Sequence, residues 1–351
     1  MLNKIRILNF RSIEKMDLYF DWNLNNIVWK NWVWKTNVLQ AISFLFWNNT
    51  FNIKNDDIIK TWENIMYLEA EFCDENSIIN KIIYSYDLEN DKKQILLNSK
   101  KSTKKALDEK LLKVCSFYPI TMNLFYLGPK YRREFLDDIL NNCYPEYKKL
   151  TKDYENVVKN RNKVLKNINL WNSKPSEIDF WDNAFLDLCE KIYKYRINIC
   201  DFFQENISKN KDFFHDKNLD IKFQYKTKTN LKDIRNSIND YLKTNFQRDI
   251  ILAKTSIWPH IDDFDILINK KQIINFASRW ETKSVIMTLK LIEMDYLKSI
   301  TWKTPILLID DLSSELDEEH IDLFLWKINN IQTIFTSILA LNKENITLIN
   351  I

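Results

Sequence analysis

The near absence of glycine is the strongest constraint on how this chain can fold. The sequence has 351 residues and 1 glycine, whereas an average usage of about 7% predicts roughly 25. Tryptophan, usually among the rarest residues, occurs 12 times. Glycine normally supplies positive φ at turns, helix C-caps and phosphate-binding loops. Either the fold avoids such positions, or some printed residues differ from those of the native protein.

The rest of the composition indicates a globular, cytoplasmic protein. A hydrophobic fraction of 45% supports one large or two modest domains, and a net charge of +3 neither requires nor excludes nucleic acid. The five cysteines show no CxxC spacing and the three histidines form no HxxxH or HExxH pair, so we expect neither a disulfide framework nor a His- or Cys-held metal. No apolar run approaches the roughly 18 residues of a membrane span, so no membrane partner is expected.

The periodicity of apolar residues predicts an α/β architecture. Strands are predicted within residues 2–30, followed by a helix from Val38 to Phe46. Alternation from Met66 to Leu88 predicts antiparallel strands with one solvated face. Spacings of three and four over Tyr147–Ile168 and Phe185–Phe202 predict either an antiparallel helical hairpin or an ordinary helical subdomain.

Strands and helices return after about Asp216. We predict a β-hairpin at 265–274, a helix at 285–297, a buried strand at 305–310 and a further strand at 333–338. The helical region then interrupts one split α/β domain. The predicted divisions are 1–117 for the first part of the head, 118–215 for the helical arm, and 216–351 for the second part of the head.

A phosphate-binding loop is predicted between a buried strand and an amphipathic helix, in NIVWKNWVWKTNVLQAI. The pattern G-x-x-x-x-G-K-[ST] is met at Lys35 and Thr36, but tryptophan occupies its glycine positions. Glycine at the three tryptophans would give GKNGVGKT, a complete Walker A motif. The loop needs glycine because successive backbone N–H groups must turn toward the phosphates, and three indoles would fill that space. The predicted loop comprises Trp29, Lys30, Asn31, Trp32, Val33, Trp34, Lys35 and Thr36.

A second predicted site follows the apolar strand of PILLIDDLSSELDEE, which ends in Asp310 and Asp311. A carboxylate at a strand tip can hold Mg²⁺ beside the Walker A threonine, and the next one can orient or deprotonate the attacking water. Paired acids also occur at solvated strand ends, so this pair is informative only because Lys35 and Thr36 precede it in the expected order. We therefore predict ATP and Mg²⁺ as ligands, with Thr36 and Asp310 on the metal side.

The segment FASRWETKSVIMTLKLIEMDYL predicts an ABC-type signature at the start of a helix. With glycine at Trp280 it contains SRGE, similar to the S-G-G-Q signature in which a serine and a helix N-terminus face the γ-phosphate of a partner subunit. Taken alone, Ser278 is better explained as a simple N-cap, but Asp310, Asp311 and a D-loop follow in the ABC order. The predicted residues are Ser278, Arg279, Trp280 and Glu281 for the signature, and Ser314, Glu315, Leu316 and Asp317 for the D-loop.

Together these segments resemble the RecF family of bacterial DNA replication and repair proteins. The resemblance spans nearly the whole chain, from IRILNFRSIEKMDLYF through LGPKYRREFLDDIL, VVKNRNKVLKNIN and WPHIDDFDILI to SRWETKS and IDDLSSELDEE. It implies an ABC-type, Rad50-like P-loop ATPase head, with a split mixed sheet, an antiparallel β subdomain and an inserted helical arm. It also implies ATP-dependent dimerisation on single-stranded or gapped DNA, weak ATPase activity, and cooperation with RecR and RecO in bringing RecA to DNA after damage.

The resemblance also implies roles for individual residues. Lys35 and Thr36 would contact phosphate and Mg²⁺, Asp310 would be the metal-side carboxylate, and Asp311 would be the hydrolytic base. Two further pairs are Ser278 with Asp317, acting across the dimer, and Arg132 with Arg133, which match the paired arginines of the arm motif. An exposed helix start explains that arginine pair equally well. His260 lies in a segment similar to the family's GPH motif, and we expect it to be structural.

The departures from the family pattern are nearly all of one kind, because tryptophan stands where the family has glycine. We hypothesise that the gene reads UGA as glycine and was translated with a code that reads UGA as tryptophan; UGG codons at Trp29, Trp32, Trp34 and Trp280 would refute this. Trp181, in contrast, matches a tryptophan of the family. The remaining tryptophans assigned to glycine positions, turns or helix ends are Trp22, Trp47, Trp62, Trp171, Trp258, Trp302 and Trp326.

Two functional interpretations remain open. With glycine in the loop, the chain is an ATP-dependent DNA-binding protein; with native tryptophans, it is a RecF-shaped scaffold for DNA or protein that cannot seat ATP. A condensin or Rad50-type protein needs a far longer coiled coil, a transporter ATPase lacks the arm, and an overcoming-lysogenization-type nuclease needs a further metal-binding Toprim domain. The Lys-rich segments LNSKKSTKKALDEK and KNKDFFHDK are candidate DNA contacts, although a solvated surface is the commoner explanation for such runs.

Overall fold

The computed structural model describes residues 1–28, 32–47, 58–107, 110–214, 216–257, 259, 261–315, 317–337 and 345–350. These residues form two compact units. No helix in the described part of the chain is both long and apolar enough to cross a membrane. Unit 1 contains Met1–Asn123, Lys211–Lys217 and Ser278–Ile351, and unit 2 contains Leu124–Asn210 and Asn218–Ala277.

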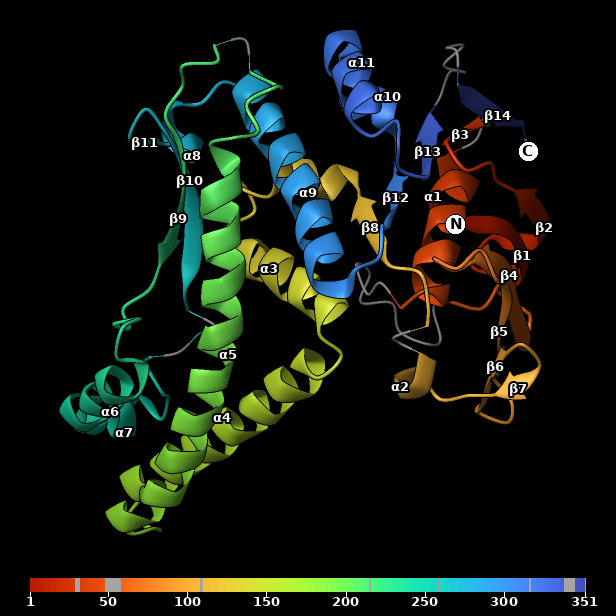
Figure 1. The fold of residues 1–351 in the computed structure, drawn as a ribbon. Helices are drawn as coiled ribbons and strands as arrows, with labels where there is room; N and C mark the ends of the chain where they lie inside the picture. Colours follow the sequence, from red (N-terminus) through yellow and green to blue (C-terminus); the bar gives the residue numbers. More distant parts are fainter. Residues whose placement is uncertain are drawn as a thin grey trace. The chain divides into compact units, whose positions relative to one another are not determined.

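Unit 1 contains an antiparallel sheet with the strand order β2-β1-β4-β5-β6-β7 (Figure 1). Its apolar residues alternate along the strands, so one face enters the core: Ile5 and Ile7 of β1 are fully buried and pair with Leu18 and Met16 of β2. The predicted antiparallel strands are thereby confirmed. The strands are β1 Leu2–Phe10, β2 Ile13–Tyr19, β4 Ile65–Cys73, β5 Ile79–Asp87, β6 Lys92–Leu97 and β7 Lys100–Lys101.

A parallel sheet with the order β14-β3-β13-β12-β8 forms the other layer of unit 1. The residues of β8, β12 and β13 are buried throughout, as expected for parallel strands covered on both faces. The predicted strands at 305–310 and 333–338 therefore exist with slightly narrower bounds. The strands are β3 Leu24–Val28, β8 Val114–Phe117, β12 Ile306–Ile309, β13 Thr333–Ser337 and β14 Ile346–Asn350.

Helix α1, Trp32–Leu45, joins the two sheets of unit 1. It contacts β1 and β4 of the antiparallel sheet and β13 of the parallel sheet, and Leu39 and Ile42 are fully buried in the shared core. Because apolar residues recur along α1 at helical spacing, the helix buries side chains against both sheets. The other helices of unit 1 are α2 Lys104–Leu107, η2 Pro119–Asn123, α9 Arg279–Thr301, α10 Leu312–Glu315 and α11 Glu318–Lys327.

Two long helices dominate unit 2. α4, Tyr147–Asn169, and α5, Ile178–Ile207, lie side by side and are joined through η3, Pro175–Glu177 (Figure 1). The buried Arg161 on α4 donates to Asp182 on α5 at 2.6 Å and to Asp249 at 3.2 Å. Both helices predicted from the apolar spacing are present.

Unit 2 also contains a small antiparallel sheet with the order β11-β10-β9, formed by β9 Ile221–Lys226, β10 Asp263–Ile268 and β11 Lys271–Gln272. The predicted division limited the arm to 118–215 and put residues 216–351 in the head. The structure departs from that division, because this sheet lies in unit 2. Residues 218–277 group with the helices because β9 and β10 pair with each other, β9 contacts α5, and β10 contacts α3. The remaining helices of unit 2 are α3 Pro129–Cys143, α6 Ile234–Thr244, α7 Phe246–Leu252 and α8 Ile273–Phe276.

Four tryptophans among the described residues have a left-handed backbone. Their φ angles are 61° at Trp47, 75° at Trp62, 61° at Trp171 and 59° at Trp302. Trp302 is the C-cap of α9, and its N–H donates to the carbonyl oxygen of Lys298 at 2.9 Å. Helices commonly end on a left-handed residue of this kind, which is usually glycine because a Cβ is unfavourable there.

Two of these tryptophans occupy other positions that favour glycine. Trp171 directly follows the C-cap of α4, and its N–H donates to the carbonyl oxygen of Ile168 at 3.0 Å. Trp62 is the third residue of a turn that the Glu63 N–H closes by donating to the Lys60 carbonyl oxygen at 3.0 Å. Positive φ at the third residue of a turn is characteristic of type II turns, which take glycine or asparagine there.

Candidate functional site

In the sequence, the predicted phosphate-binding loop lies between β3, which ends at Val28, and α1, which begins at Trp32. Trp29, Lys30 and Asn31 lie outside the described residues, and Trp32 and Val33 begin α1. β3 pairs with β14 on one side and with β13 on the other. Since these strands are parallel, the carboxyl ends of β3, β13 and β12 lie at one edge of the sheet, where ligands of open α/β sheets bind.

Lys35 lies at this edge with its side chain turned to the end of β13. Its ammonium donates to the carbonyl oxygen of Ser337 at 2.9 Å, and the residue is only 4% exposed. Burial lowers the pKa of Lys35, while the charges of Asp311 and Asp310 act in the opposite direction. The preceding Trp34 is partly buried and packs against the core of unit 1.

A direct hydrogen bond joins Thr36 to Asp310. The Thr36 hydroxyl donates to Asp310 Oδ2 at 2.7 Å, and the Thr336 hydroxyl donates to Asp310 Oδ1 at 2.9 Å. Asp310 directly follows β12, so the parallel pairing of β12 with β13 brings it beside Thr336. Burial raises the pKa of Asp310, and these two hydrogen bonds oppose the shift. The structure therefore brings the predicted Walker A threonine and strand-tip carboxylate together.

Asp311 lies next to this pair in a left-handed conformation, with φ of 52°. Its N–H donates to the Thr336 hydroxyl at 2.8 Å, and the residue is 8% exposed. One of its carboxylate oxygens, Oδ1, is buried and has no hydrogen-bond partner within the described ranges. A buried acceptor of this kind is unfavourable unless a donor reaches it, so it suits a carboxylate that orients water.

The oxygen atoms at this edge suit Mg²⁺ bound together with phosphate. The Thr36 hydroxyl and the Asp310 carboxylate are hard oxygen donors, and Mg²⁺ is usually held by one or two carboxylates together with phosphate and water oxygens. The described residues contain no cluster of three or more His, Cys, Asp or Glu side chains that could hold a metal by themselves. The donor set is therefore complete only with ligand oxygens.

The predicted signature forms the first turn of α9. Ser278 is its N-cap: the Ser278 hydroxyl accepts from the Glu281 N–H at 3.1 Å, and the Glu281 carboxylate accepts from the Ser278 N–H at 2.8 Å. This reciprocal capping box fixes the start of the helix. Arg279 is exposed, and the ring of Trp280 lies 4.6 Å from the ring of His320.

The predicted D-loop runs from α10 into α11. Ser314 and Glu315 end α10, Leu316 lies outside the described residues, and Asp317 is the N-cap of α11. Asp317 Oδ1 accepts from the backbone N–H of His320 at 3.0 Å, and this hydrogen bond holds the pKa of Asp317 below its usual range. The start of α11 is thereby tied to the last residue of the loop.

The paired arginines of the arm motif make contacts within unit 2. Arg132 binds both carboxylate oxygens of Asp263 at 2.8 Å, and Arg133 donates to the Asp262 carbonyl oxygen at 3.2 Å. Arg132 is buried, so its guanidinium joins α3 to β10 and is not exposed as a helix start would be. His260, with the neighbouring Trp258, lies outside the described residues.

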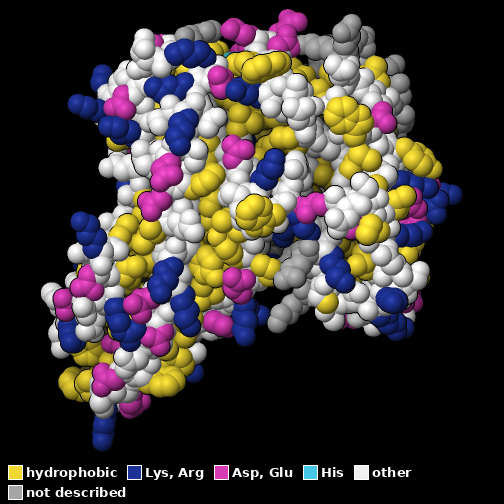
Figure 2. Space-filling view, viewed as in Figure 1, with side chains coloured by type: hydrophobic (Ala, Val, Ile, Leu, Met, Phe, Trp, Pro, Cys, Tyr) yellow, Lys and Arg dark blue, Asp and Glu magenta, His cyan; other side chains and the backbone are white. Residues whose placement is uncertain are grey.

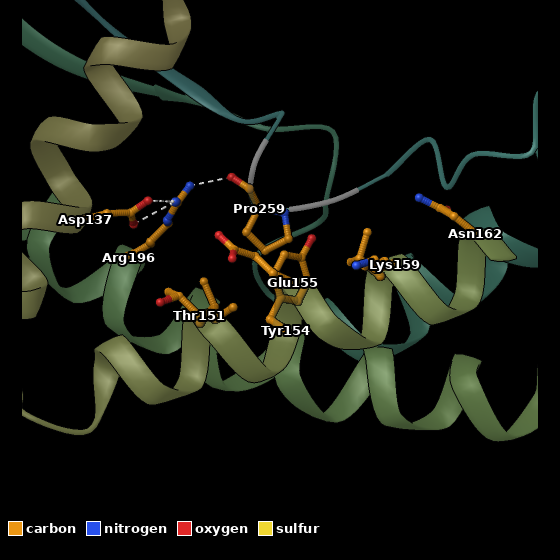
Figure 3. A pocket seen from close by; sticks show the side chains of 10 residues that line it. Asp137, Thr151, Tyr154, Glu155, Lys159, Asn162, Arg196 and Pro259 are labelled. Carbon is orange, nitrogen blue, oxygen red and sulfur yellow. Dashed lines mark hydrogen bonds and ion pairs between the residues drawn. The ribbon is translucent and has the colours of Figure 1, made fainter. Parts of the chain in front are cut away.

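Unit 2 also contains a pocket of about 460 Å³ beside α4 and α5 that the sequence did not indicate (Figure 3). Arg196 lines it, binds Asp137 through both carboxylate oxygens at 2.8 and 2.9 Å, and also donates to the Pro259 carbonyl oxygen. Of the described residues in the predicted loop, strand tip, signature and D-loop, none lines this pocket. On the face shown in Figure 2, Lys and Arg side chains are interspersed with Asp and Glu.

Comparisons with known proteins find sequence relatives over nearly the full length of this chain. No family model matches the chain. The DNA replication and repair protein RecF of Thermoanaerobacter sp. (strain X514) is 30% identical over 337 residues, which cover 93% of this chain and 91% of that protein. RecF of Clostridium botulinum (strain ATCC 19397 / Type A) is 33% identical over 351 residues, covering 95% and 92%.

Two solved structures share the fold over almost the full length. One, described as the recombination mediator protein RecF with ATPrS in the RecFOR pathway, has a TM-score of 0.88 at 26% identity and covers 100% of this chain and 96% of that chain. The other, described as RecF with ATP in the same pathway, has a TM-score of 0.84 at 25% identity and covers 98% and 93%. With the sequence relatives, these likenesses show that the chain belongs to the RecF family of DNA replication and repair proteins.

Proposed function

We propose that this protein binds ATP with Mg²⁺ at the edge of its parallel sheet and, as an ATP-dependent dimer, binds single-stranded or gapped DNA. The observation that carries the proposal is the 2.7 Å hydrogen bond between Thr36 and Asp310, with the Lys35 ammonium held at the neighbouring strand end. This bond unites two motifs that lie 274 positions apart in the sequence. The solved relatives described with ATP and ATPrS support the same ligand.

Each side chain at this edge has a chemical role in the proposal. The Lys35 ammonium binds phosphate oxygens as a point charge. Thr36 and Asp310 hold Mg²⁺, which supplies positive charge to the phosphates when bound. Asp311 presents its buried carboxylate oxygen to the attacking water, which it orients or deprotonates. In this proposal ATP hydrolysis is slow, and it causes the DNA-bound dimer to dissociate.

The dimer uses the start of α9 and the D-loop. The exposed Ser278 is the N-cap of α9, and the helix dipole favours an anion at this end of the helix. In the proposed dimer, Ser278 faces the γ-phosphate held by the other subunit, and Asp317 lies at the same interface. We further infer that the protein acts with RecR and RecO to bring RecA to gapped DNA; the RecFOR pathway in the descriptions of the solved relatives supports this.

ATP binding by this loop requires glycine at positions 29, 32 and 34, where the sequence has tryptophan. We propose that the native protein has glycine at these three positions. The left-handed backbones of Trp47, Trp62, Trp171 and Trp302 support the proposal independently of the motif, because they occupy helix ends and a turn that favour glycine. Three of them are almost fully solvent-exposed, at 98% for Trp62, 94% for Trp171 and 83% for Trp302. At those three sites the exposed indole makes no buried contacts that would favour tryptophan over glycine.

The native codons test this part of the proposal directly. UGA at the seven positions, in a gene whose UGG codons encode residues such as Trp181, agrees with glycine; UGG at the three loop positions contradicts it. In the second case the chain is a RecF-shaped scaffold for DNA or protein that does not seat ATP.

The function itself is tested on a form of the protein with glycine at positions 29, 32 and 34, called the glycine form. Its mass is measured by sedimentation with ATP, Mg²⁺ and gapped DNA. We expect ATP-dependent dimers. In a separate assay of ATP hydrolysis, we expect Asp310→Asn to lower the Mg²⁺-dependent rate by on the order of 100-fold, the scale of losing one group that stabilises the transition state, because Asp310 would help to hold the Mg²⁺. Asp240→Asn, an exposed change on α6, is the matched control. The proposal would be contradicted if the two variants hydrolysed ATP at equal rates, or if the mass measured by sedimentation did not increase with ATP.

A further inference from the structure

A buried histidine links the two segments that the proposed dimer uses. His320 lies in the first turn of α11 and is 2% exposed. Its Nδ1 lies 2.9 Å from each carboxylate oxygen of Asp317, the D-loop residue, and its Nε2 lies 3.1 Å from the hydroxyl of Ser284 on α9. The same ring therefore contacts the D-loop on one side and the signature helix on the other.

The hydrogen bonds of this cluster determine how its protons are arranged. The Asp317 carboxylate only accepts, so His320 Nδ1 carries a proton. The Ser284 hydroxyl also lies 2.8 Å from the carbonyl oxygen of Phe213, to which it donates. The bond between Nδ1 and Asp317 therefore does not depend on which way the Ser284 hydroxyl turns.

The position of Ser284 makes this link relevant to the signature. Ser284 lies four residues after Trp280, so both side chains project from the same face of α9. A ring held against that face fixes the first turns of α9, which begin at Ser278. Glycine at position 280 would remove the ring contact with Trp280 but leave both hydrogen bonds, because their partners are Asp317 and Ser284.

We propose that His320 is a positioning residue that holds Asp317 of the D-loop in fixed register with the signature helix. The two segments then approach the partner subunit's nucleotide as one rigid unit. His320 itself contacts no nucleotide in this proposal, which rests on the proposed ATP-dependent dimer for its functional consequence. The link between α9 and α11 exists within one subunit, so it can be tested without the dimer.

Two substitutions separate the two hydrogen bonds. In His320→Asn the amide nitrogen takes the approximate place of Nδ1, which keeps the bond to Asp317 and removes the one to Ser284. In His320→Gln the amide nitrogen takes the approximate place of Nε2, which does the reverse. His320→Ala removes both bonds, and Glu318→Gln, an exposed change in the same helical turn, is the matched control.

The first readout is amide hydrogen exchange of the glycine form without nucleotide. We expect His320→Ala to speed exchange both in residues 278–284 and in residues 317–320, whereas Glu318→Gln leaves both segments unchanged. We also expect a Ser284→Ala, His320→Ala double variant to differ little from His320→Ala in the signature segment, because residues in one network are not additive. Unchanged exchange at 278–284 in His320→Ala would overturn the link, whatever the dimer does.

The second readout is nucleotide binding against dimerisation. ATP affinity of the monomer should stay the same in the three single His320 variants and in Glu318→Gln, while ATP-dependent dimerisation should weaken roughly tenfold in His320→Asn and His320→Gln and more in His320→Ala. A loss of ATP affinity equal to the loss of dimerisation would show general damage and overturn the positioning role. If the unsubstituted protein fails to dimerise with ATP, the proposed function fails, and the hydrogen-exchange result still decides the link.

Discussion

Replacing a left-handed tryptophan by glycine should stabilise this protein. Trp171 follows α4 in unit 2 and Trp302 caps α9 in unit 1, with φ of 61° and 59°. Their side chains are 94% and 83% exposed, so little packing is lost with the indole. Most Trp→Gly changes destabilise a folded protein, which makes the opposite sign at these two sites a specific consequence of the backbone.

The magnitude follows from two opposing contributions. A left-handed conformation is unfavourable by roughly 1–2 kcal/mol for a residue with a Cβ, and glycine removes that strain. Glycine also makes the unfolded chain more flexible, which lowers stability by about 0.4–1 kcal/mol. We therefore expect a net gain of about 0.8 kcal/mol for Trp171→Gly and for Trp302→Gly, the difference between the midpoints of these two ranges. Trp47 is unsuitable for this test because its ring packs against Tyr84.

The assay is urea unfolding followed by far-UV circular dichroism, which does not depend on tryptophan fluorescence. Trp181→Gly is the control, because Trp181 lies inside α5, where glycine costs about 1 kcal/mol relative to a good helix former. We expect a higher urea midpoint for Trp171→Gly and Trp302→Gly and a lower one for Trp181→Gly. A lower midpoint for all three variants would refute the reasoning from the backbone.

Three further predictions concern the site, the arm and DNA. Because burial raises the pKa of Asp310, the folded protein binds that proton more tightly than the unfolded chain does, so stability from this group falls as pH rises from the ordinary Asp range through the raised pKa. Mg²⁺-dependent nucleotide binding should strengthen over the same window, and titrations of Asp310→Asn should show neither slope. Arg132→Ala should lower the stability of unit 2 by about 2 kcal/mol, since it leaves the partly buried Asp263 unpaired, without changing ATP affinity in a nucleotide titration. DNA affinity measured by fluorescence anisotropy should fall linearly with log salt concentration, and a flat response would exclude phosphate contacts as its source.

The regular elements of unit 1 were predictable because their apolar periods are strong. The alternation in β4 and β5 and the helical spacing of α1 and α9 are visible in the sequence, and the order of Lys35, Thr36 and Asp310 indicated the site. The pairing of Thr36 with Asp310 depends on strand order in the parallel sheet, which local sequence does not contain. The order of the motifs and the resemblance to RecF predicted that Thr36 and Asp310 meet, but neither gave the order of the strands.

The parts that the sequence did not predict rest on long-range contacts of charged and polar residues. Arg132 was indistinguishable from an exposed helix start until β10 placed Asp263 beside it. The pairing of β9 with β10, and their contacts with α5 and α3, bring residues 218–277 into unit 2. His320 gave no signal because a lone histidine matches no ligand pattern, although its position three residues after Asp317 is the N3 position of a helix capped by that aspartate.

ATP binding by two forms of the chain tests the central claim most directly. One form carries glycine at positions 29, 32 and 34, and the other carries tryptophan as printed. A Lys35→Ala change in the glycine form shows whether binding uses the loop. In equilibrium titrations with Mg²⁺, we predict saturable ATP binding by the glycine form that the printed form and Lys35→Ala lack. Equal ATP affinity for the glycine and tryptophan forms would contradict the claim that this loop binds phosphate only when glycine is present.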